Sequence, residues 1–360
     1  MSHDPKRRFQ LAPAETTSAG PFNPSLADAP PLPIVDFAAV GKAPPTLLDT
    51  PAKAPPKAST VVICWTEAEW AALQQVFCGA TAPLAYSSRT KGNWPGWQTW
   101  TADLPASAPK GWDHWGSYRL VEVNGAPTLL LKSNTHLDFP GASALEQMVR
   151  LLISNVQPTL ILSTGTAGGA KPGDHVGTVR ATSASTLFEA GTARSGWPIY
   201  SNGWTAGKGV LGQPNLAQLL SPVPATAAAI ATLAAQFNQH FGTHYGLADL
   251  DPLGLNKADP VPAWFDQTGG SASLLTTPTF VVATTAGNLA NFTVVEMDDA
   301  IIGKACGTTT AFASVRNVSD PAQAAALPAA GQKNWGSAVY DVFGFYTSFN
   351  GAVVAWAALN

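Results

Sequence analysis

The chain has 360 residues and is 46% hydrophobic, which suits one large α/β domain or a domain with an extension. Its formal net charge of −3 provides no basic field for a nucleic acid polymer or an anionic membrane, so we expect a small-molecule partner. Three cysteines are too few for a disulfide framework and indicate a reducing compartment, the cytoplasm. The first residues lack the apolar core of a signal peptide, and no apolar run approaches the roughly 20 residues of a membrane-spanning helix.

Residues 1–57 are expected to form an N-terminal extension, because they are rich in Pro and Ala and show neither helical nor strand periodicity. Such a segment is either disordered or laid as an extended strap along a neighbouring subunit. The folded domain is expected over 58–360. It opens with a β-branched strand at 60–65, followed by a helix with Thr66 as N-cap and Glu69 at its N3 position.

The rest of the domain alternates between strand and helix patterns, which predicts a sheet covered by helices. Two segments interrupt the alternation: a Trp-rich loop at 91–115 and an insertion at 187–275 that contains many Gly and Pro residues. In the closing helix, apolar side chains recur at three- and four-residue spacing, so one face must be buried. The other expected strands are 118–123, 128–132, 159–163, 176–181, 279–284 and 311–318, and the expected helices are 141–155, 225–241, one from Glu296 and one from Trp335.

Three parts of this pattern carry polar or glycine-rich motifs. A strand, a short loop and an acidic helix start occupy 63–69, and a strand with a glycine turn at 160–169 is followed by Gly-Asp-His-Val at 173–176. Val-Glu-Met-Asp stands at 295–298, and Arg-Asn-Val-Ser-Asp at 316–320 ends a predicted strand. Together and in this order, the motifs resemble those of the nucleoside phosphorylase/nucleosidase superfamily, most closely the methylthioadenosine/adenosylhomocysteine nucleosidases.

The resemblance implies a three-layer α/β/α sandwich around a twisted mixed sheet, assembled as a homo-oligomer. It implies an enzyme, a hydrolase that cleaves the N-glycosidic bond of a purine nucleoside or a related nucleoside without a cofactor or a metal. Two alternatives remain open. A phosphate-dependent phosphorylase would use phosphate in place of water, and a non-catalytic nucleoside-binding protein would keep the scaffold without the proton transfer.

Breaking this bond places negative charge on the departing base, so an acid must face the base. Asp320 ends a strand, where ligand-facing groups collect in open α/β sheets, and the resemblance implies that it protonates the purine at N7. The alternative interpretation is a simple Asp-Pro turn with Pro321. The resemblance also implies that Glu69 activates water, a role compatible with its place in a capping box, and Glu67 is the less favoured candidate.

On the sugar side, the resemblance implies that Met297 lies under the ring and that Asp298 accepts hydrogen bonds from ribose hydroxyls. The superfamily usually has Glu at the second position, so Asp298 is one methylene shorter. His136 and His175 are expected to be loop histidines satisfied by neighbours, and the alternative is that the turn after 132 brings the side chain of Asn134 or His136 into the pocket. The further substrate-binding residues that the resemblance implies are Glu296, Arg316, Ser319, Gly165, Gly168, Gly169, Ser133 and Asn134.

Two other patterns are rejected as sites. The glycine pattern at 207–212 has the spacing of a dinucleotide-binding motif, but no strand precedes it and Pro214 follows it. His240 and His244 stand four residues apart, but a glycine separates them and no acidic partner accompanies them, so no metal is expected.

Overall fold

The computed structural model describes residues 22, 24, 31–79, 95–170, 175–202, 216–221, 227–250, 265–267, 273–278, 289–322 and 327–360. Several parts of the sequence pattern lie outside these residues: most of the extension before residue 31, the start of the Trp-rich loop at 91–94, the Gly-Asp pair of the 173–176 motif, much of the insertion at 187–275 with the glycine pattern at 207–212, and the strand expected at 279–284. Among the described residues, none of the helices combines the length and the apolarity needed to span a bilayer.

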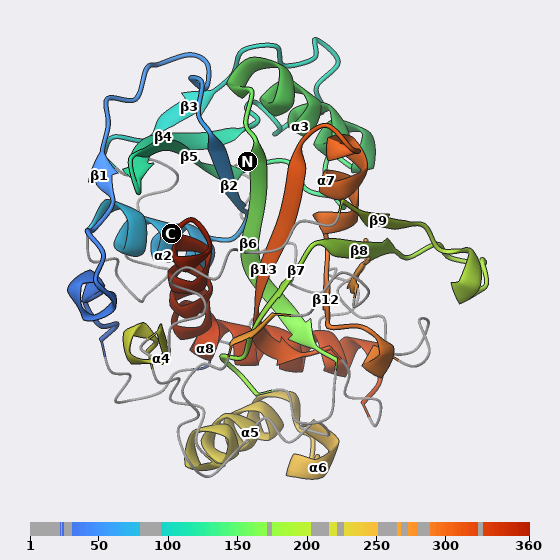
Figure 1. Ribbon diagram of the computed structural model, residues 1–360. Coiled ribbons are helices and arrows are strands. Elements are labelled where there is room, and N and C mark those ends of the chain that lie inside the picture. Colours follow the sequence, from blue (N-terminus) through green and yellow to red (C-terminus); the bar gives the residue numbers. More distant parts are fainter. Residues whose placement is uncertain are drawn as a thin grey trace.

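A single mixed sheet runs through the molecule (Figure 1). Its main path has the order β1-β4-β5-β2-β6-β12-β11-β8-β9, and β13 pairs with β6 and β7 beside that path. β2 runs parallel to β5 and β6, whereas β4 pairs antiparallel with β5 and β12 pairs antiparallel with β6. The strands are β1 (Thr46–Leu47), β2 (Thr60–Cys64), β3 (Gln98–Trp100), β4 (Gly116–Val123), β5 (Ala126–Ser133), β6 (Leu160–Gly169), β7 (Val179–Thr182), β8 (Ala184–Leu187), β9 (Ile199–Ser201), β10 (Phe265–Gln267), β11 (Leu274–Thr276), β12 (Val294–Glu296) and β13 (Ala311–Pro321).

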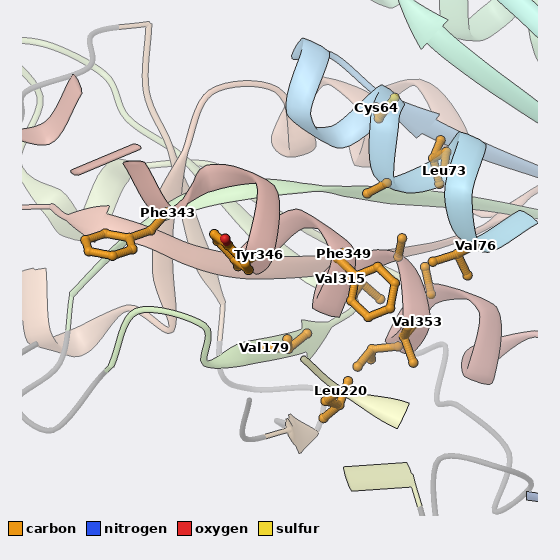
Figure 2. Packing of buried hydrophobic residues seen from close by; sticks show 14 of the residues in the cluster. Cys64, Leu73, Val76, Val179, Leu220, Val315, Phe343, Tyr346, Phe349 and Val353 are labelled. Atoms are coloured by element: carbon orange, nitrogen blue, oxygen red, sulfur yellow. The ribbon is translucent and has the colours of Figure 1, made fainter. Parts of the chain in front are cut away.

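Helices cover both faces of this sheet, which confirms the expected three-layer α/β/α sandwich. On one face, Leu162 of β6 belongs to a core with Leu73 of α2 and Phe349 of α8, part of which is drawn in Figure 2. On the other, its neighbour Ile161 packs with residues of α3 and α7. This division follows from the strand period, which sends successive side chains to opposite faces. The α-helices are α2 (Glu67–Cys78), α3 (Ala142–Val156), α4 (Leu216–Leu219), α5 (Ala227–Phe241), α6 (Leu247–Leu250), α7 (Asp299–Cys306) and α8 (Ala329–Ala358).

The Trp-rich segment differs from the irregular loop that its composition predicts. Part of it forms β3, which pairs with β4, and Trp100 and Trp115 are fully buried with ring centroids 5.7 Å apart. Trp97 packs edge-on against Trp70 of α2 at 5.3 Å. Large aromatic side chains contribute most when they are buried, and here they extend the core around the β4 side of the sheet.

Two motif segments also differ in their local structure. The glycine turn expected after 163 continues as strand, because β6 pairs with β13 as far as Gly169. The helix expected from Glu296 begins at Asp299, because Val294 and Val295 form the strand β12, where β-branched side chains fit well.

Residues 31–57 lie against the domain of the same chain. Val40 is buried in the core beside α8, and the ring of Phe37 lies 4.7 Å from that of Trp356. β1 pairs antiparallel with β4, and the Tyr118 hydroxyl donates to the carbonyl oxygen of Pro51 at 2.6 Å. This part of the extension is therefore a packed layer on the sheet and α8.

Candidate active site

A pocket opens where β2, β6 and β13 end, next to α8, and it contains about 700 Å³ of space free of protein atoms. Parallel strands present their carboxyl ends to ligands in open α/β sheets, and small-molecule sites are concave pockets of this kind. Seven of the residues predicted from the motifs line it: Glu69, Gly168, Glu296, Met297, Asp298, Arg316 and Asp320. Segments far apart in the chain are thus brought to one site.

Glu69 is held rigidly at the first turn of α2. Its Oε2 accepts from the backbone N–H groups of Trp65 and Thr66, both at 2.8 Å, and Thr66 Oγ1 accepts from Glu69 N at 3.4 Å, which completes the expected capping box. Its Oε1 accepts from Thr166 N at 2.7 Å and from Thr166 Oγ1 at 2.8 Å. The carboxylate therefore joins the end of β2 to the end of β6 in the pocket wall.

Arg316 lies beneath the pocket as a buried cation. Its Nε and Nη2 donate to the two carboxylate oxygens of Asp299 at 2.8 and 2.6 Å, and Nη2 also donates to Ser163 Oγ at 2.7 Å. Burial by itself would lower the pKa of Arg316, but the charges of Asp299 and Glu296 outweigh it and raise that pKa. Such a bidentate pair fixes the plane of the guanidinium.

Glu296 organises the turn that carries Met297 and Asp298. Its carboxylate accepts from the N–H groups of Asp298 and Asp299, from the Thr276 hydroxyl, and lies 3.1 Å from Arg316 Nη2. Burial, with the nearby charge of Asp299, raises its pKa to about 7. Glu296 thus acts on the site mainly through the backbone that it holds.

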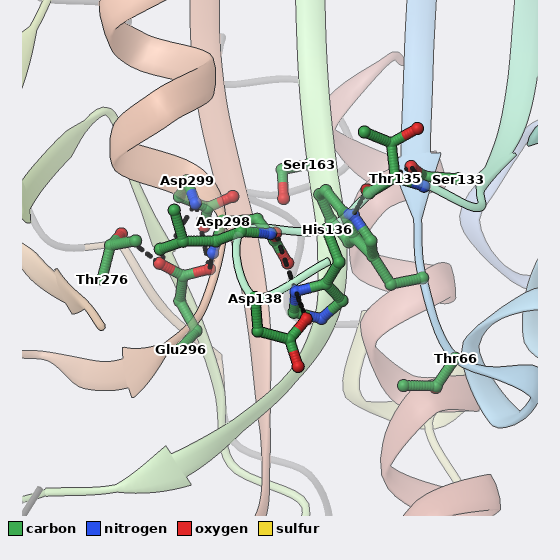
Figure 3. Close-up of polar contacts among 12 residues, drawn as sticks. Thr66, Ser133, Thr135, His136, Asp138, Ser163, Thr276, Glu296, Asp298 and Asp299 are labelled. Carbon is green, nitrogen blue, oxygen red and sulfur yellow. Dashed lines mark hydrogen bonds and ion pairs between the residues drawn. The ribbon is translucent and has the colours of Figure 1, made fainter. Parts of the chain in front are cut away.

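Asp298 precedes α7 and is almost fully buried. Its Oδ1 accepts from Leu137 N at 2.9 Å and lies 3.1 Å from His136 Nδ1, as Figure 3 shows. Burial, reinforced by the charge of Glu296, raises the pKa of Asp298 well above its usual range. Its Oδ2 has no hydrogen bond to the described residues, so this oxygen is open to a ligand in the pocket.

Asp320 reaches the pocket through an irregularity in β13. The register with β6 shifts between Val318 and Asp320, which leaves Ser319 as an extra residue and places Asp320 opposite Gly168. Asp320 is part of the strand, so it does more than open an Asp-Pro turn. Ser319 Oγ donates to Asp320 Oδ1 at 2.5 Å, and burial raises the pKa of this carboxyl to about 7 although the Ser319 bond opposes that rise.

The three predicted glycines serve close contacts within the protein. A Cβ at Gly165 would lie 2.7 Å from Arg316 Nη1 and 2.8 Å from Glu69 Oε1, and one at Gly168 would lie 2.8 Å from Ala322 Cα. Gly169 pairs with Val294 of β12. Of the three, only Gly168 lines the pocket. The missing side chains at Gly165 and Gly168 leave space for Glu69, Arg316 and Ala322, so these glycines do not form the ligand-binding turn that the motif predicts.

Ser133 and Asn134 do not line the pocket. The Ser133 hydroxyl donates to Thr135 O at 2.6 Å and accepts from Thr135 N at 2.9 Å, which closes the turn after β5 on itself. Asn134 Nδ2 donates to the carbonyl oxygen of His114 at 3.3 Å. The segment contributes His136 to the pocket instead, two residues further along.

Other lining residues were missed by the sequence analysis. Trp65 directly follows β2, a position that could have indicated a pocket residue, and the guanidinium of Arg316 lies 5.1 Å from its ring. Tyr340 comes from α8, and no signal in the sequence connects it with the motifs. Within the described part of the chain, no group of three or more His, Cys, Asp or Glu side chains is placed to hold a metal ion.

No protein-family model and no curated protein matches the chain. Solved structures similar to it include the 5′-methylthioadenosine/S-adenosylhomocysteine nucleosidase from Neisseria meningitidis in complex with methylthio-immucillin-A, with 16% identity, 83% of this chain and 98% of that chain covered, and a TM-score of 0.45. The Streptococcus pneumoniae MTA/SAH nucleosidase in complex with 8-aminoadenine has 15% identity, coverage of 84% and 98%, and a TM-score of 0.46. The futalosine hydrolase of Helicobacter pylori has 9% identity, coverage of 83% and 97%, and a TM-score of 0.44.

These solved structures are nucleosidases and a related hydrolase, the class of protein that the motifs of this chain resemble. At 9–16% sequence identity, the similarity is one of fold.

Proposed function

We propose that this protein hydrolyses the N-glycosidic bond of a purine nucleoside or a related nucleoside. The observation that carries the proposal is Asp320, a buried carboxyl that lines the pocket and whose pKa is raised to about 7. A carboxyl with this pKa is protonated in a useful fraction near neutral pH and can still release its proton. An acid of that kind is what a departing purine requires.

The reaction balances with the groups in the pocket. The oxygen of a water molecule forms a bond to C1′ of the sugar, and the C1′–N9 bond breaks with its electron pair moving to the base. The Asp320 proton passes to N7 of the leaving purine, and one proton of the water passes to Glu69. The open Oδ2 of Asp298 accepts a hydrogen bond from a sugar hydroxyl, next to Met297.

The surroundings of Glu69 restrict how it can accept a proton. A carboxylate has about four acceptor positions, and here four protein donors use them: three backbone N–H groups and the Thr166 hydroxyl. Of these donors, only the hydroxyl can turn away by rotation about a single bond. We therefore propose that the Thr166 hydroxyl leaves Oε1 when the attacking water binds there.

The charges of the pocket favour water over phosphate as the acceptor. Glu69, Asp298 and Asp320 line it, and Arg316, the one cationic arginine of its wall, is engaged by Asp299 through two nitrogens. A phosphate dianion beside the Glu69 carboxylate would meet like-charge repulsion in a partly desolvated site, and the described wall has no unengaged arginine to offset it. The phosphorylase alternative lacks the cations that it needs among the described residues.

A panel of purine and pyrimidine nucleosides, incubated with and without phosphate, tests the proposal directly. We expect free base and free sugar from purine nucleosides, at a rate that phosphate does not change. Glu69→Gln should lose turnover, whereas Glu67→Gln, on the same first turn of α2, should retain it. A sugar 1-phosphate product would establish the phosphorylase alternative, and tight binding without cleavage would establish the binding protein. Purine preference, assembly as a homo-oligomer and the cytoplasm as location remain predictions within this proposal.

A further inference from the structure

His136 stands between two carboxylates at the sugar end of the pocket. It follows β5, and its Nδ1 lies 3.1 Å from Asp298 Oδ1 and 3.3 Å from Asp138 Oδ1. Figure 3 shows the imidazole between these two side chains. The side chain of His136 is 9% exposed and that of Asp298 is 3% exposed, so water screens their contact only weakly.

Because of this contact, the two carboxylate oxygens of Asp298 differ in how accessible they are to a ligand. Oδ1 is covered from two sides, by Leu137 N at 2.9 Å and by His136 Nδ1 at 3.1 Å. Leu137 N uses one acceptor position of Oδ1, and the imidazole, which contacts Oδ1 without the alignment of a hydrogen bond, takes up the space beside the other, so a ligand hydroxyl is kept from Oδ1. Oδ2, in contrast, has no hydrogen bond to the described residues.

A carboxylate with both oxygens open can accept from both hydroxyls of a vicinal diol at once. With one oxygen covered, the remaining oxygen can be well aligned with only one of the two hydroxyls. The second hydroxyl then contributes little, because losing it leaves no buried acceptor without a donor.

We propose that His136 is a positioning residue that, by covering Oδ1 of Asp298, makes the site select one of the two ring hydroxyls of its nucleoside. This inference rests on the proposed function, because it presumes a sugar at Asp298. The inference gives His136 a role at the pocket wall, where the sequence favoured a loop histidine that hydrogen-bonds to a neighbour.

The chain contains a natural control for this arrangement. His114 Nδ1 lies 2.5 Å from Asp113 Oδ1, but the two side chains are 30% and 83% exposed, and neither lines the pocket. A substitution at His114 removes the same pair of residue types without touching the site.

The test compares two analogues of one good riboside substrate, the 2′-deoxy and the 3′-deoxy forms, in wild type, His136→Ala, His136→Asn and His114→Ala. The measured quantity is the ratio of kcat/KM between the two analogues. Wild type and His114→Ala should discriminate by about tenfold or more, the effect of one unsatisfied buried acceptor. His136→Ala opens one acceptor position on Oδ1, so the ratio should fall to within about threefold. His136→Asn, whose amide can donate from nearly the position of Nδ1, should restore the discrimination.

A general loss of folding would lower both rates together and leave the ratio unchanged, so the ratio separates the two effects. Equal rates on the two analogues in wild type would overturn the inference, as would an unchanged ratio in His136→Ala. If no nucleoside is cleaved, the proposed function fails by itself. In that case the ratio of the Kd values of the 2′-deoxy and 3′-deoxy analogues is measured instead. Each of the four proteins is expected to show the same discrimination in Kd as is stated above for kcat/KM.

Discussion

Asp320 and Glu296 are both buried carboxyls with a pKa of about 7, but their surroundings differ. Glu296 accepts from two backbone N–H groups and the Thr276 hydroxyl, and it contacts Arg316, so its proton acceptor sites are used by the fold. Asp320 has one hydrogen bond among the described residues, from Ser319. At the scale of single residues, Asp320 is therefore the carboxyl that is free to give its proton to a ligand.

Replacing Asp320 with Asn tests this role. The amide keeps the size and an acceptor for Ser319 but cannot donate an acidic proton, so single-turnover cleavage should slow by about a hundredfold or more while nucleoside affinity survives. Because the folded-state pKa of Asp320 is raised, this carboxyl adds to the stability that the wild type loses as the pH rises from about 4 through about 7, and the variant should lose less because only groups such as Glu296 still contribute. Asp320→Asn should thus melt at a higher temperature than wild type at pH 8 and at a similar one at pH 4. Wild-type cleavage by the variant would rule out the proposed acid.

The pH profile gives an independent test through Ser319. The active form of Asp320 is protonated, so kcat should fall as the pH rises through about 7. The Ser319 hydroxyl stabilises the carboxylate and lowers this pKa, so Ser319→Ala should move the alkaline limb of the profile to higher pH. Thr276→Val, which removes a hydrogen bond from Glu296, should leave the limb in place if Asp320 is the group observed. If the alkaline limb shifts in Thr276→Val and not in Ser319→Ala, the titrating group is Glu296 rather than Asp320.

At the scale of elements, Gly165 of β6 leaves space beside it for both Glu69 of α2 and Arg316 of β13, because it has no side chain. In Gly165→Ala, the new Cβ would meet Arg316 Nη1 and Glu69 Oε1 at less than 3 Å, and neither side chain can move without losing buried hydrogen bonds. We expect a loss of turnover of about tenfold or more, because small displacements of catalytic groups are costly.

The matched control is Gly331→Ala in α8, where the nearest atom to the new Cβ is Leu327 Cβ at 3.4 Å. Alanine is a better helix former than glycine, so this variant should keep turnover and melt at the same temperature or higher. Thermal melting and kcat for the two variants check the prediction. Full activity in Gly165→Ala would show that the positions of Glu69 and Arg316 do not limit the reaction.

At the scale of the whole molecule, residues 31–41 complete the core beside α8. Leu32 is 7% exposed within that core, whereas Ile34, two residues away, is 87% exposed. Leu32→Ala should lower the free energy of unfolding by about 2–5 kcal/mol, as other buried Leu-to-Ala changes do, and Ile34→Ala should change it by less than about 0.5 kcal/mol. Denaturant unfolding of the two variants measures this difference. Equal, small effects would mean that the segment does not contribute to the stability of the domain.

The elements that could be predicted from the sequence are those with a local cause. The strand at 60–64, the capped start of α2 and the buried face of α8 follow from side-chain periodicity and from a hydrogen bond between Thr66 and Glu69, three residues apart. The start of α7 was placed too early, because the valine pair at the beginning of the polar motif forms a strand when partner strands lie beside it. One partner, β11, lies about twenty residues earlier in the chain, and no local sequence pattern indicates that it pairs with β12.

By itself, the sequence determined the alternation of the main strands and helices, the layered class of fold and the positions of the acidic motifs that line the pocket. Only the tertiary structure decided which side chains meet there. It paired Arg316 with Asp299, turned Ser133 and Asn134 away, and brought His136 to Asp298 across more than 160 residues. The physical reason is that periodicity and capping depend on neighbours within a few residues, whereas contacts across the pocket depend on how strands align and helices pack.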